Sequence, residues 1–216
     1  MANVRSIGIQ RSDLHWQPTL LGAVGAATGF DASFSGARRI DLDESAWVEH
    51  VAGWVAGDEA LFENVVAAAP WEHRTVLMYD RMVAEPRLTA WYGRRLADAS
   101  VLPILSEMAA ALQARFHRAF DSVGAALYRD GHDSVAWHSD RLDPTLVEPV
   151  VAIVSLGSAR TLRMRSRERG GATRPFLLLP GDLFVMGGSA QTMWQHAVPK
   201  VSRAGARVSL QFRHST

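Results

Sequence analysis

The sequence predicts an α+β domain whose β part is a sandwich or a jelly roll. Helical patterns dominate the first part of the chain, and after about Ser122 it consists of short β-rich runs separated by glycine-containing turns. Helices followed by many short strands at near-regular spacing are typical of this class. At 216 residues, 48% of them hydrophobic, the chain can bury one real core. No repeat, linker or low-complexity tract divides it, so residues 1–216 are expected to form a single domain.

The N-terminal third is expected to contain two helices after an irregular start. Residues 1–40 are rich in Gly, Ser and Ala without a sustained period, which predicts an irregular N-terminal wrap. DESAWVEHVAGW (43–54) has an acidic first turn and large apolar residues at helical spacing, which predicts a helix. DEALFENVVAAAP (58–70) predicts a second helix, with an aspartate to cap it and a proline to stop it.

The remaining elements follow in order. Residues 74–92 predict two strands joined by a short turn. Residues 101–120 form the clearest amphipathic helix, because apolar residues recur on one face at Leu105, Met108, Leu112 and Phe116. The β core is expected over about residues 122–214, built from the runs GAALY, SVAWH, VVAIVSL, RTLRMR, FLLL, DLFVM, WQHAV and RVSLQF.

Composition excludes several classes of protein. The chain has no cysteine, so disulfides, thiolate nucleophiles and iron–sulfur clusters are excluded, and histidine and carboxylates remain as metal ligands. This is compatible with a cytoplasmic location. The most apolar run, at 19–30, is too short to span a bilayer, so no membrane association is expected.

Charge gives a weaker indication. The net charge of +1 produces no overall field for a polyanion. One region is locally basic, with Glu168 as its single acidic residue and arginines at positions 160, 163, 165, 167, 169 and 174. We interpret it either as a solvated face or as a track for nucleic acid.

The stretch SVAWHSD ends in two candidate metal ligands, His138 and Asp140. This spacing alone is common by chance, but His196 in the strand-like run WQHAV offers a third ligand. Two histidines and one carboxylate leave three positions open on Fe(II), which an oxygen-activating site requires. Zinc more often recruits a further protein ligand. The number of ligands therefore favours iron.

The run RVSLQFR (207–213) alternates strictly between polar and apolar residues. If the polar face met solvent, this would be an ordinary half-buried strand. If it faced the interior of a barrel, Arg207 and Arg213 would need anionic partners, because an unpaired buried charge is costly. A dicarboxylate such as 2-oxoglutarate would supply them, and Tyr128 could donate its hydroxyl to the same anion.

Five separated stretches resemble the AlkB family of Fe(II)- and 2-oxoglutarate-dependent dioxygenases, which oxidatively dealkylate nucleic-acid bases. They occur in the family's order and cover most of the chain from about residue 40. The resemblance implies a double-stranded β-helix, or jelly-roll, core with N-terminal helices packed on the outside. The stretches are PRLTAWYG (86–93), LYRDGHDSVAWHSD (127–140), SARTLRMR (158–165), WQHAVPK (194–200) and RVSLQFR (207–213).

The resemblance also implies roles for individual residues. Arg207 would pair with the distal carboxylate of 2-oxoglutarate, helped by Tyr128, and Arg213 would lie near the cosubstrate's other end. Ser209 would take the cosubstrate-binding place of a usual asparagine. The catalytic ligands of Fe(II) would be His138, Asp140 and His196.

The implied reaction consumes O2 and 2-oxoglutarate and yields succinate and CO2. The N-methyl group of a base is hydroxylated and lost as formaldehyde, after the base has left the stack. The expected partner is alkylated single- or double-stranded DNA, or RNA, with no obligate protein partner. Substrate contacts are expected from Trp91, Tyr92 and Arg160.

The chain also departs from the family pattern. Ala126 and Ser209 replace two common asparagines, and Leu142 stands where an acidic residue often contacts the base. No aromatic residue occurs between Tyr92 and Phe116, where the family commonly has one that stacks on the base. Either Trp91 or Tyr92 takes over stacking, or base recognition differs. Two alternatives therefore stay open: a 2-oxoglutarate-dependent hydroxylase of a small molecule or protein side chain, and a non-catalytic jelly-roll binding protein.

Overall fold

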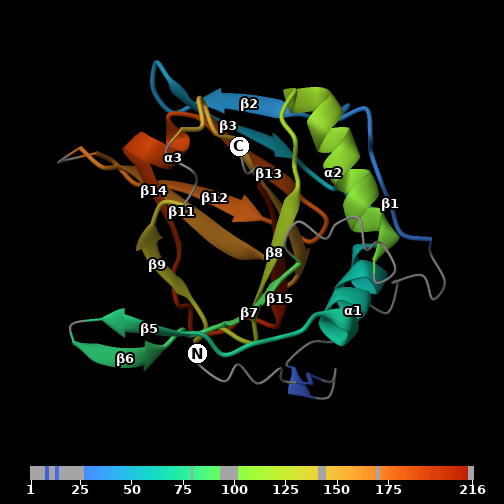
Figure 1. The fold of residues 1–216 in the computed structure, drawn as a ribbon, viewed down its shortest axis with the longest axis vertical. Coiled ribbons are helices and arrows are strands. Elements are labelled where there is room, and N and C mark those ends of the chain that lie inside the picture. Colours follow the sequence, from blue (N-terminus) through green and yellow to red (C-terminus); the bar gives the residue numbers. More distant parts are fainter. Residues whose placement is uncertain are drawn as a thin grey trace.

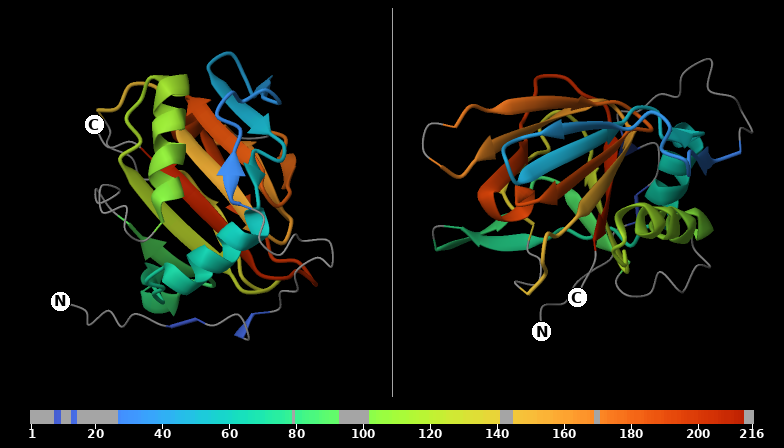
Figure 2. Two further views of the ribbon diagram at one scale, coloured as in Figure 1. Left: turned by 90° about the vertical axis from the view of Figure 1, so that its right-hand side faces the viewer. Right: turned by 90° about the horizontal axis from the view of Figure 1, so that it is seen from above.

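The computed structural model describes residues 8–9, 13–14, 27–78, 80–92, 102–140, 145–168 and 171–213. Two antiparallel sheets face each other, and two helices cover the outer face of the larger one (Figures 1 and 2). The larger sheet contains, in spatial order, β2 (Arg38–Asp41), β3 (Ala46–Val51), β13 (Leu183–Gly188), β10 (Val151–Gly157), β15 (Arg207–Arg213), β8 (Ser122–Tyr128) and β7 (Leu88–Trp91). The smaller sheet contains β12 (Arg174–Leu178), β11 (Arg160–Ser166), β14 (Trp194–Val198) and β9 (Val135–His138).

The other elements are short or lie outside the two sheets. The covering helices are α1 (Asp58–Ala68) and α2 (Pro103–Phe116), and a single turn, α3 (Ala190–Met193), connects β13 to β14. Two further strand pairs are β1 (Gly29–Phe30) with β4 (Val55–Ala56), and the hairpin of β5 (Thr75–Met78) with β6 (Arg81–Ala84), which projects from the barrel in Figure 1. None of the helices in the described ranges is long and apolar enough to cross a membrane.

Two apolar cores lie on the two faces of the larger sheet. The outer core joins this sheet to the helices and includes Leu61 and Phe62 of α1 and Met108 and Leu112 of α2. The inner core fills the space between the two sheets; there the rings of Phe176 and Phe184 lie 5.0 Å apart. Because side chains alternate along a strand, the central strands β8, β10 and β13 contribute apolar side chains to both cores. The two sheets together form the predicted jelly roll.

Most of the predicted elements are confirmed. Residues 103–116 are helical, and Leu105, Met108 and Leu112 of the predicted apolar face are buried. Residues 58–68 form the other predicted helix, but its N-cap is Gly57 and not the predicted Asp58, and no side chain caps it by a hydrogen bond. All eight β-rich runs after Ser122 are strands. Residues 74–92 contain three strands rather than two, because β7 separates from the β5–β6 hairpin and pairs with β8.

Two N-terminal predictions are wrong. Residues 46–51 form strand β3, not a helix, and pair with β2 and β13. Both faces of β3 are covered: Val48 enters the inner core, while Glu49 on the opposite face accepts a 2.8 Å hydrogen bond from Arg115 of α2. Burial on both faces removes the alternation that would have revealed a strand. Likewise, the expected irregular wrap over 1–40 includes β1 and most of β2.

Candidate metal centre and cosubstrate pocket

The two sheets bring the predicted ligands together inside the barrel. His138 at the end of β9 pairs in register with His196 of β14, and their ring centroids lie 4.3 Å apart. Asp140 follows β9 by two residues, and its Oδ2 lies 3.6 Å from Nε2 of His196. One potential ligand atom from each residue lies within 4.8 Å of the others. This geometry is what the sequence predicted for a two-histidine, one-carboxylate site.

Neighbouring groups orient these side chains. His138 Nδ1 lies 2.9 Å from the carbonyl oxygen of Ala136, which leaves Nε2 available to a metal. Asp140 Oδ1 accepts hydrogen bonds from Arg213, at 3.1 Å from Nε and also from Nη2. The backbone N–H of Asp140 donates to Oε1 of Gln191 at 3.2 Å. The carboxylate therefore keeps Oδ2 for the metal while Oδ1 is held by the arginine.

Electrostatics place the site in its metal-binding protonation state. Burial alone would raise the pKa of Asp140, but Arg213 and the two histidines lower it to about 2. Burial lowers the pKa of His196 to about 4, although Asp140 acts in the opposite direction. A metal needs a neutral imidazole and an ionised carboxylate, and both are present at neutral pH. The buried Nδ1 of His196 has no hydrogen-bond partner among the described residues, and the ligand set fits Fe(II).

Strand β15 turns its polar face into the barrel, so the second of the two sequence interpretations applies. Arg207 is 1% exposed, and its Nε donates to Oγ of Ser155 at 3.0 Å. Its Nη1 is buried without a hydrogen-bond partner in the part of the chain that the structure describes. The Tyr128 ring centroid lies 5.3 Å from its guanidinium carbon. A buried, incompletely bonded guanidinium fits a carboxylate ligand such as the distal carboxylate of 2-oxoglutarate.

The other residues of this polar face already have partners. Ser209 is buried opposite Ser155 and Ala126, and its hydroxyl accepts a 2.8 Å hydrogen bond from Gln211. Arg213 lies at the metal end of the strand, where it bonds Asp140. The predicted cosubstrate roles of Ser209 and Arg213 remain predictions, and the observed contact of Arg213 is to the metal ligand.

At the edge of the large sheet, Trp91 and Tyr92 point to opposite faces of β7. Trp91 is 57% exposed, and its ring centroid lies 5.9 Å from the guanidinium carbon of Arg213. Tyr92 packs against the outer core, and burial raises the pKa of its hydroxyl to about 12. The prediction that Tyr92 contacts substrate is therefore wrong, because it faces away from the metal centre. The role of Trp91 remains a prediction that its position favours.

The prediction that Arg160 contacts the substrate is also wrong. It is 3% exposed, and its guanidinium donates to the backbone carbonyls of Asp130, Asp133 and Pro199. A side chain buried in this way cannot act as a surface contact for nucleic acid. Leu142 and Asp143, whose positions bear on lesion preference, lie outside the described residues.

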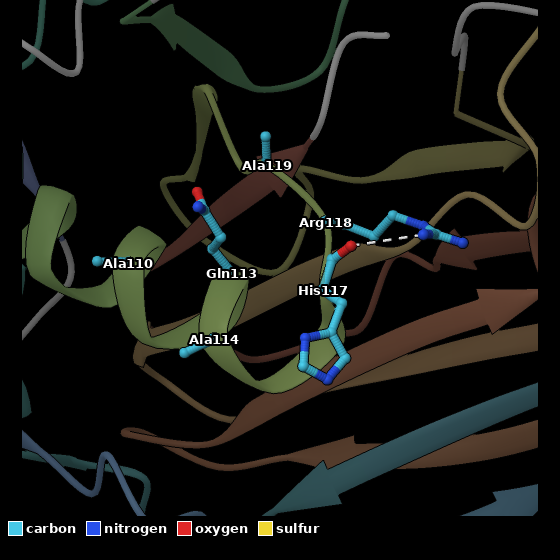
Figure 3. A pocket seen from close by; sticks show the side chains of 6 residues that line it. All are labelled: Ala110, Gln113, Ala114, His117, Arg118 and Ala119. Carbon is cyan, nitrogen blue, oxygen red and sulfur yellow. Dashed lines mark hydrogen bonds between the residues drawn. The ribbon is translucent and has the colours of Figure 1, made fainter.

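Two residues of the site were missed by sequence reasoning. Ser155, which bonds Arg207, is the one polar residue in the buried run VVAIVSL, and that was an available signal. Gln191, which bonds the backbone of Asp140, gave no signal, because it lies on the short turn α3. Figure 3 shows a separate hollow at the C-terminal end of α2, lined by Gln113, His117 and Arg118, which includes none of the predicted site residues.

Comparison with known proteins agrees with this geometry. The family description "2OG-Fe(II) oxygenase superfamily" matches residues 59–213. The fold and the site thus define an Fe(II)- and 2-oxoglutarate-dependent oxygenase, and the chain belongs to that superfamily. Within it, the chain is similar to curated proteins of the AlkB family over most of its length.

Two curated relatives and one solved structure illustrate the similarity. Alpha-ketoglutarate-dependent dioxygenase alkB homolog 3 of Mus musculus is 33% identical over 193 residues, covering 81% of this chain and 63% of the relative. DNA oxidative demethylase ALKBH2 of Arabidopsis thaliana is 26% identical over 189 residues, covering 70% and 60%. A Pseudomonas putida prolyl-4-hydroxylase superposes with a TM-score of 0.47 at 15% identity, covering 78% and 93%. The chain thus spans less than two thirds of the length of these two curated relatives.

Proposed function

We propose that this protein oxidatively dealkylates N-alkylated bases in DNA or RNA. Bound Fe(II), together with 2-oxoglutarate and O2, supplies the oxidising chemistry of the superfamily. The observation that carries the proposal is the inner face of β15. There Arg207 is buried with an Nη1 donor that has no partner among the described residues, and Arg213 holds the ligand Asp140.

The protein's own groups have distinct tasks in this proposal. His138, Asp140 and His196 hold the metal, and Arg213 keeps the Asp140 carboxylate ionised and oriented. Arg207 binds the distal carboxylate of the cosubstrate. Its Nη1 is buried and has no hydrogen-bond partner among the described residues, so it can donate a charge-assisted hydrogen bond to that carboxylate.

An exposed aromatic ring supports a nucleic-acid base as the substrate. Trp91 presents its indole to solvent next to Arg213, on the same side of the sheet as the metal ligands. A base that has left the stack is stabilised by such a flat surface, with a typical contribution of about 1–3 kcal/mol. The names of the curated relatives, which include a DNA oxidative demethylase, support the same substrate class.

Formaldehyde release tests the proposal. The protein would be incubated with Fe(II), 2-oxoglutarate and oligonucleotides containing 1-methyladenine or 3-methylcytosine, as single-stranded DNA, duplex DNA and RNA. We expect formaldehyde and succinate in equal amounts from at least one of these, and none from the unmethylated strand. Normal binding of 2-oxoglutarate without turnover of any alkylated strand would contradict the proposal.

A second candidate is a 2-oxoglutarate-dependent hydroxylase of a small molecule or protein side chain. The absence of an aromatic residue between Tyr92 and Phe116, and the net charge of +1, favour it. Binding to single-stranded DNA separates the two candidates. A dealkylase of nucleic acid binds the strand with an affinity that falls as salt rises, because phosphate contacts release counterions. The second candidate predicts no such binding.

A further inference from the structure

Arg160 is a buried cation held by neutral groups. Its Nη1 donates to the carbonyl of Asp130 at 3.0 Å, and its Nη2 donates to the carbonyls of Asp133 and Pro199 at 2.9 and 2.7 Å. Its Nε is buried without a hydrogen-bond partner among the described residues. The nearby carboxylate of Asp133 is already engaged, because both of its oxygens accept from Arg129 at 2.8 Å. Arg160 therefore brings a positive charge into the interior without a carboxylate bonded to it.

This charge lies beside the proposed cosubstrate pocket. The guanidinium carbons of Arg160 and Arg207 lie 5.6 and 5.3 Å from the ring centroid of the same residue, Tyr128. Burial lowers the pKa of Arg207 to about 10, and the charge of Arg160 acts in the same direction. Both guanidiniums thus lie near the same aromatic ring and are close enough to repel each other.

Counting the charges of this corner leaves one cation in excess. Among the described residues, Arg129 and Arg160 interact with two carboxylates, Asp130 and Asp133, whereas the neighbouring Arg207 interacts with Tyr128 and Arg160 and with no carboxylate. Two of the three cations are at most 3% exposed. Because an uncompensated buried charge is strongly unfavourable, this corner favours the arrival of an anion. Arg207 alone would not create that excess.

We propose that Arg160 is a positioning residue that makes the pocket selective for a 2-oxo acid with a distal carboxylate. It acts through Tyr128, whose ring both guanidiniums approach, and through Arg207, which would bond the anion. The inference rests on the proposed function only in its cosubstrate, 2-oxoglutarate, and not in the nucleic-acid substrate.

The carbonyls that hold Arg160 also fix the position of its charge. Asp130 and Asp133 lie in the turn that leads into β9, and Pro199 directly follows β14. A planar guanidinium bridges three such acceptors, whereas the ammonium of lysine is a single point of charge on a flexible chain. Lysine at this position would retain the charge but lose most of the bridge.

Two ligands that differ only at the far end test the inference. 2-Oxoglutarate and 2-oxopentanoate share the 2-oxo acid group and the five-carbon chain, but only the first has a distal carboxylate. Binding of each to the Mn(II)-loaded protein would be measured by calorimetry, which does not depend on turnover. The variants are Arg160→Gln, Arg160→Lys and, as the matched control, Arg163→Gln, which removes an exposed arginine from the same strand.

Arg160→Gln is expected to lower the affinity for 2-oxoglutarate about tenfold, as loss of a charged interaction commonly does. The affinity for 2-oxopentanoate should not change. Arg160→Lys should keep the ratio of the two affinities near the wild-type value, even where both fall, and Arg163→Gln should alter neither affinity. Equal weakening of both ligands by Arg160→Gln would show a merely structural role and overturn the inference. If that variant does not fold, a collapsed affinity ratio in Arg160→Lys would overturn it equally.

The same experiment separates this inference from the proposed function. If wild-type protein with Mn(II) binds neither ligand, the cosubstrate assignment fails and the inference fails with it. If wild-type protein binds 2-oxoglutarate but the ratio is insensitive to Arg160→Gln, only the role of Arg160 is rejected.

Discussion

The two faces of strand β15 divide stability from chemistry. On the outer face, Val208, Leu210 and Phe212 are fully buried in the core beneath the helices. On the inner face, Arg207 and Arg213 point into the barrel. Arg207 has an Nη1 donor without a partner in the described part of the chain, and Arg213 bonds the metal ligand Asp140. The comparison shows that a single strand can satisfy packing on one side and leave bonding capacity unused on the other.

The neighbouring strands repeat this division. On β8, Val123 and Leu127 enter the outer core, while Tyr128 enters the inner one. On β10, Leu156 enters the outer core, and Ser155 faces Arg207 from the inside. The polar groups of the inner face therefore gather where β10, β15 and β8 lie side by side, which is where an anionic ligand would be held.

Removal of a metal ligand should abolish metal binding and leave the stability of the fold nearly unchanged. His138→Ala is expected to abolish measurable Mn(II) or Fe(II) binding, because two protein ligands remain of three. The free energy of unfolding of the metal-free protein should change by less than about 1 kcal/mol, since His138 is only half-buried. Calorimetric metal titration and urea unfolding measure the two quantities. His73→Ala, at an exposed position, is the control, and metal binding by the His138 variant would reject the site.

The second change removes an outer-face side chain. Phe212→Ala should lower the free energy of unfolding by about 3–5 kcal/mol, as large-to-small substitutions in a packed core do. The folded fraction of the Phe212→Ala protein should bind 2-oxoglutarate with wild-type affinity. Gln211→Ala, the adjacent residue on the opposite face, is the control and should cost less than about 1.5 kcal/mol. If Phe212→Ala and Gln211→Ala lowered the free energy of unfolding equally, the outer face of β15 would contribute no more to stability than the inner face.

The alternation of β15 is also why much of the site could be predicted from the sequence. A strictly alternating run needs one covered face and one polar face, whichever fold surrounds it. The histidine and aspartate of SVAWHSD gained meaning only from His196, almost sixty residues away, and the jelly roll explains their meeting, because it pairs β9 with β14. Local pattern identified the ligands, and the sheet pairing brought them together.

The errors arose where local pattern carries no information about the surroundings. β3 is covered on both faces, so its period was lost and its large apolar residues imitated a helix. Trp91 and Tyr92 must point to opposite sides, but the sequence does not say which side holds the metal. The basic run predicted an exposed track, whereas Arg160 is the inward-facing residue at its start.

A third, smaller effect is a pH dependence of the free energy of unfolding that arises from the buried His196. In the folded, metal-free protein the pKa of His196 lies at about 4, below its ordinary value of 6.5. Between these values the unfolded chain binds a proton that the folded chain does not, so stability must fall as pH decreases from 6.5 toward 4. From pH 7 to pH 5 this contribution is roughly 2 kcal/mol, at 1.36 kcal/mol per pKa unit.

Urea unfolding at both pH values, with a chelator present, measures the contribution. His196→Asn should lose less stability than wild type over this interval, by that amount. Asp140 does not interfere, because its lowered pKa of about 2 confines its own contribution to pH values below its ordinary 3.8. An identical pH dependence in variant and wild type would show that the buried imidazole does not titrate as inferred.

The smallest expected effect lies at the mouth of the barrel, where β8 passes beneath Trp91. A methyl group at Gly124 would lie 3.1 Å from two ring carbons of Trp91 and 3.1 Å from Nη1 of Arg213. Because Trp91 is largely exposed, its ring can move by a few tenths of an ångström at little cost. The stability of Gly124→Ala should therefore stay within about 1 kcal/mol of wild type, helped by the lower entropy of its unfolded chain.

Displacement of the Trp91 indole should separate the effect of Trp91 on the nucleic-acid substrate from the binding of 2-oxoglutarate deeper in the barrel. If Trp91 supports the base, Gly124→Ala should change the KM for an alkylated oligonucleotide a few-fold while the affinity for 2-oxoglutarate stays the same. Trp91→Phe is the matched variant, because it keeps an aromatic face without moving the backbone. If the affinity for 2-oxoglutarate changed instead, the effect would act through Arg213, whose guanidinium lies close to the same methyl group. Arg213 would then link the position of Trp91 to the metal ligand Asp140.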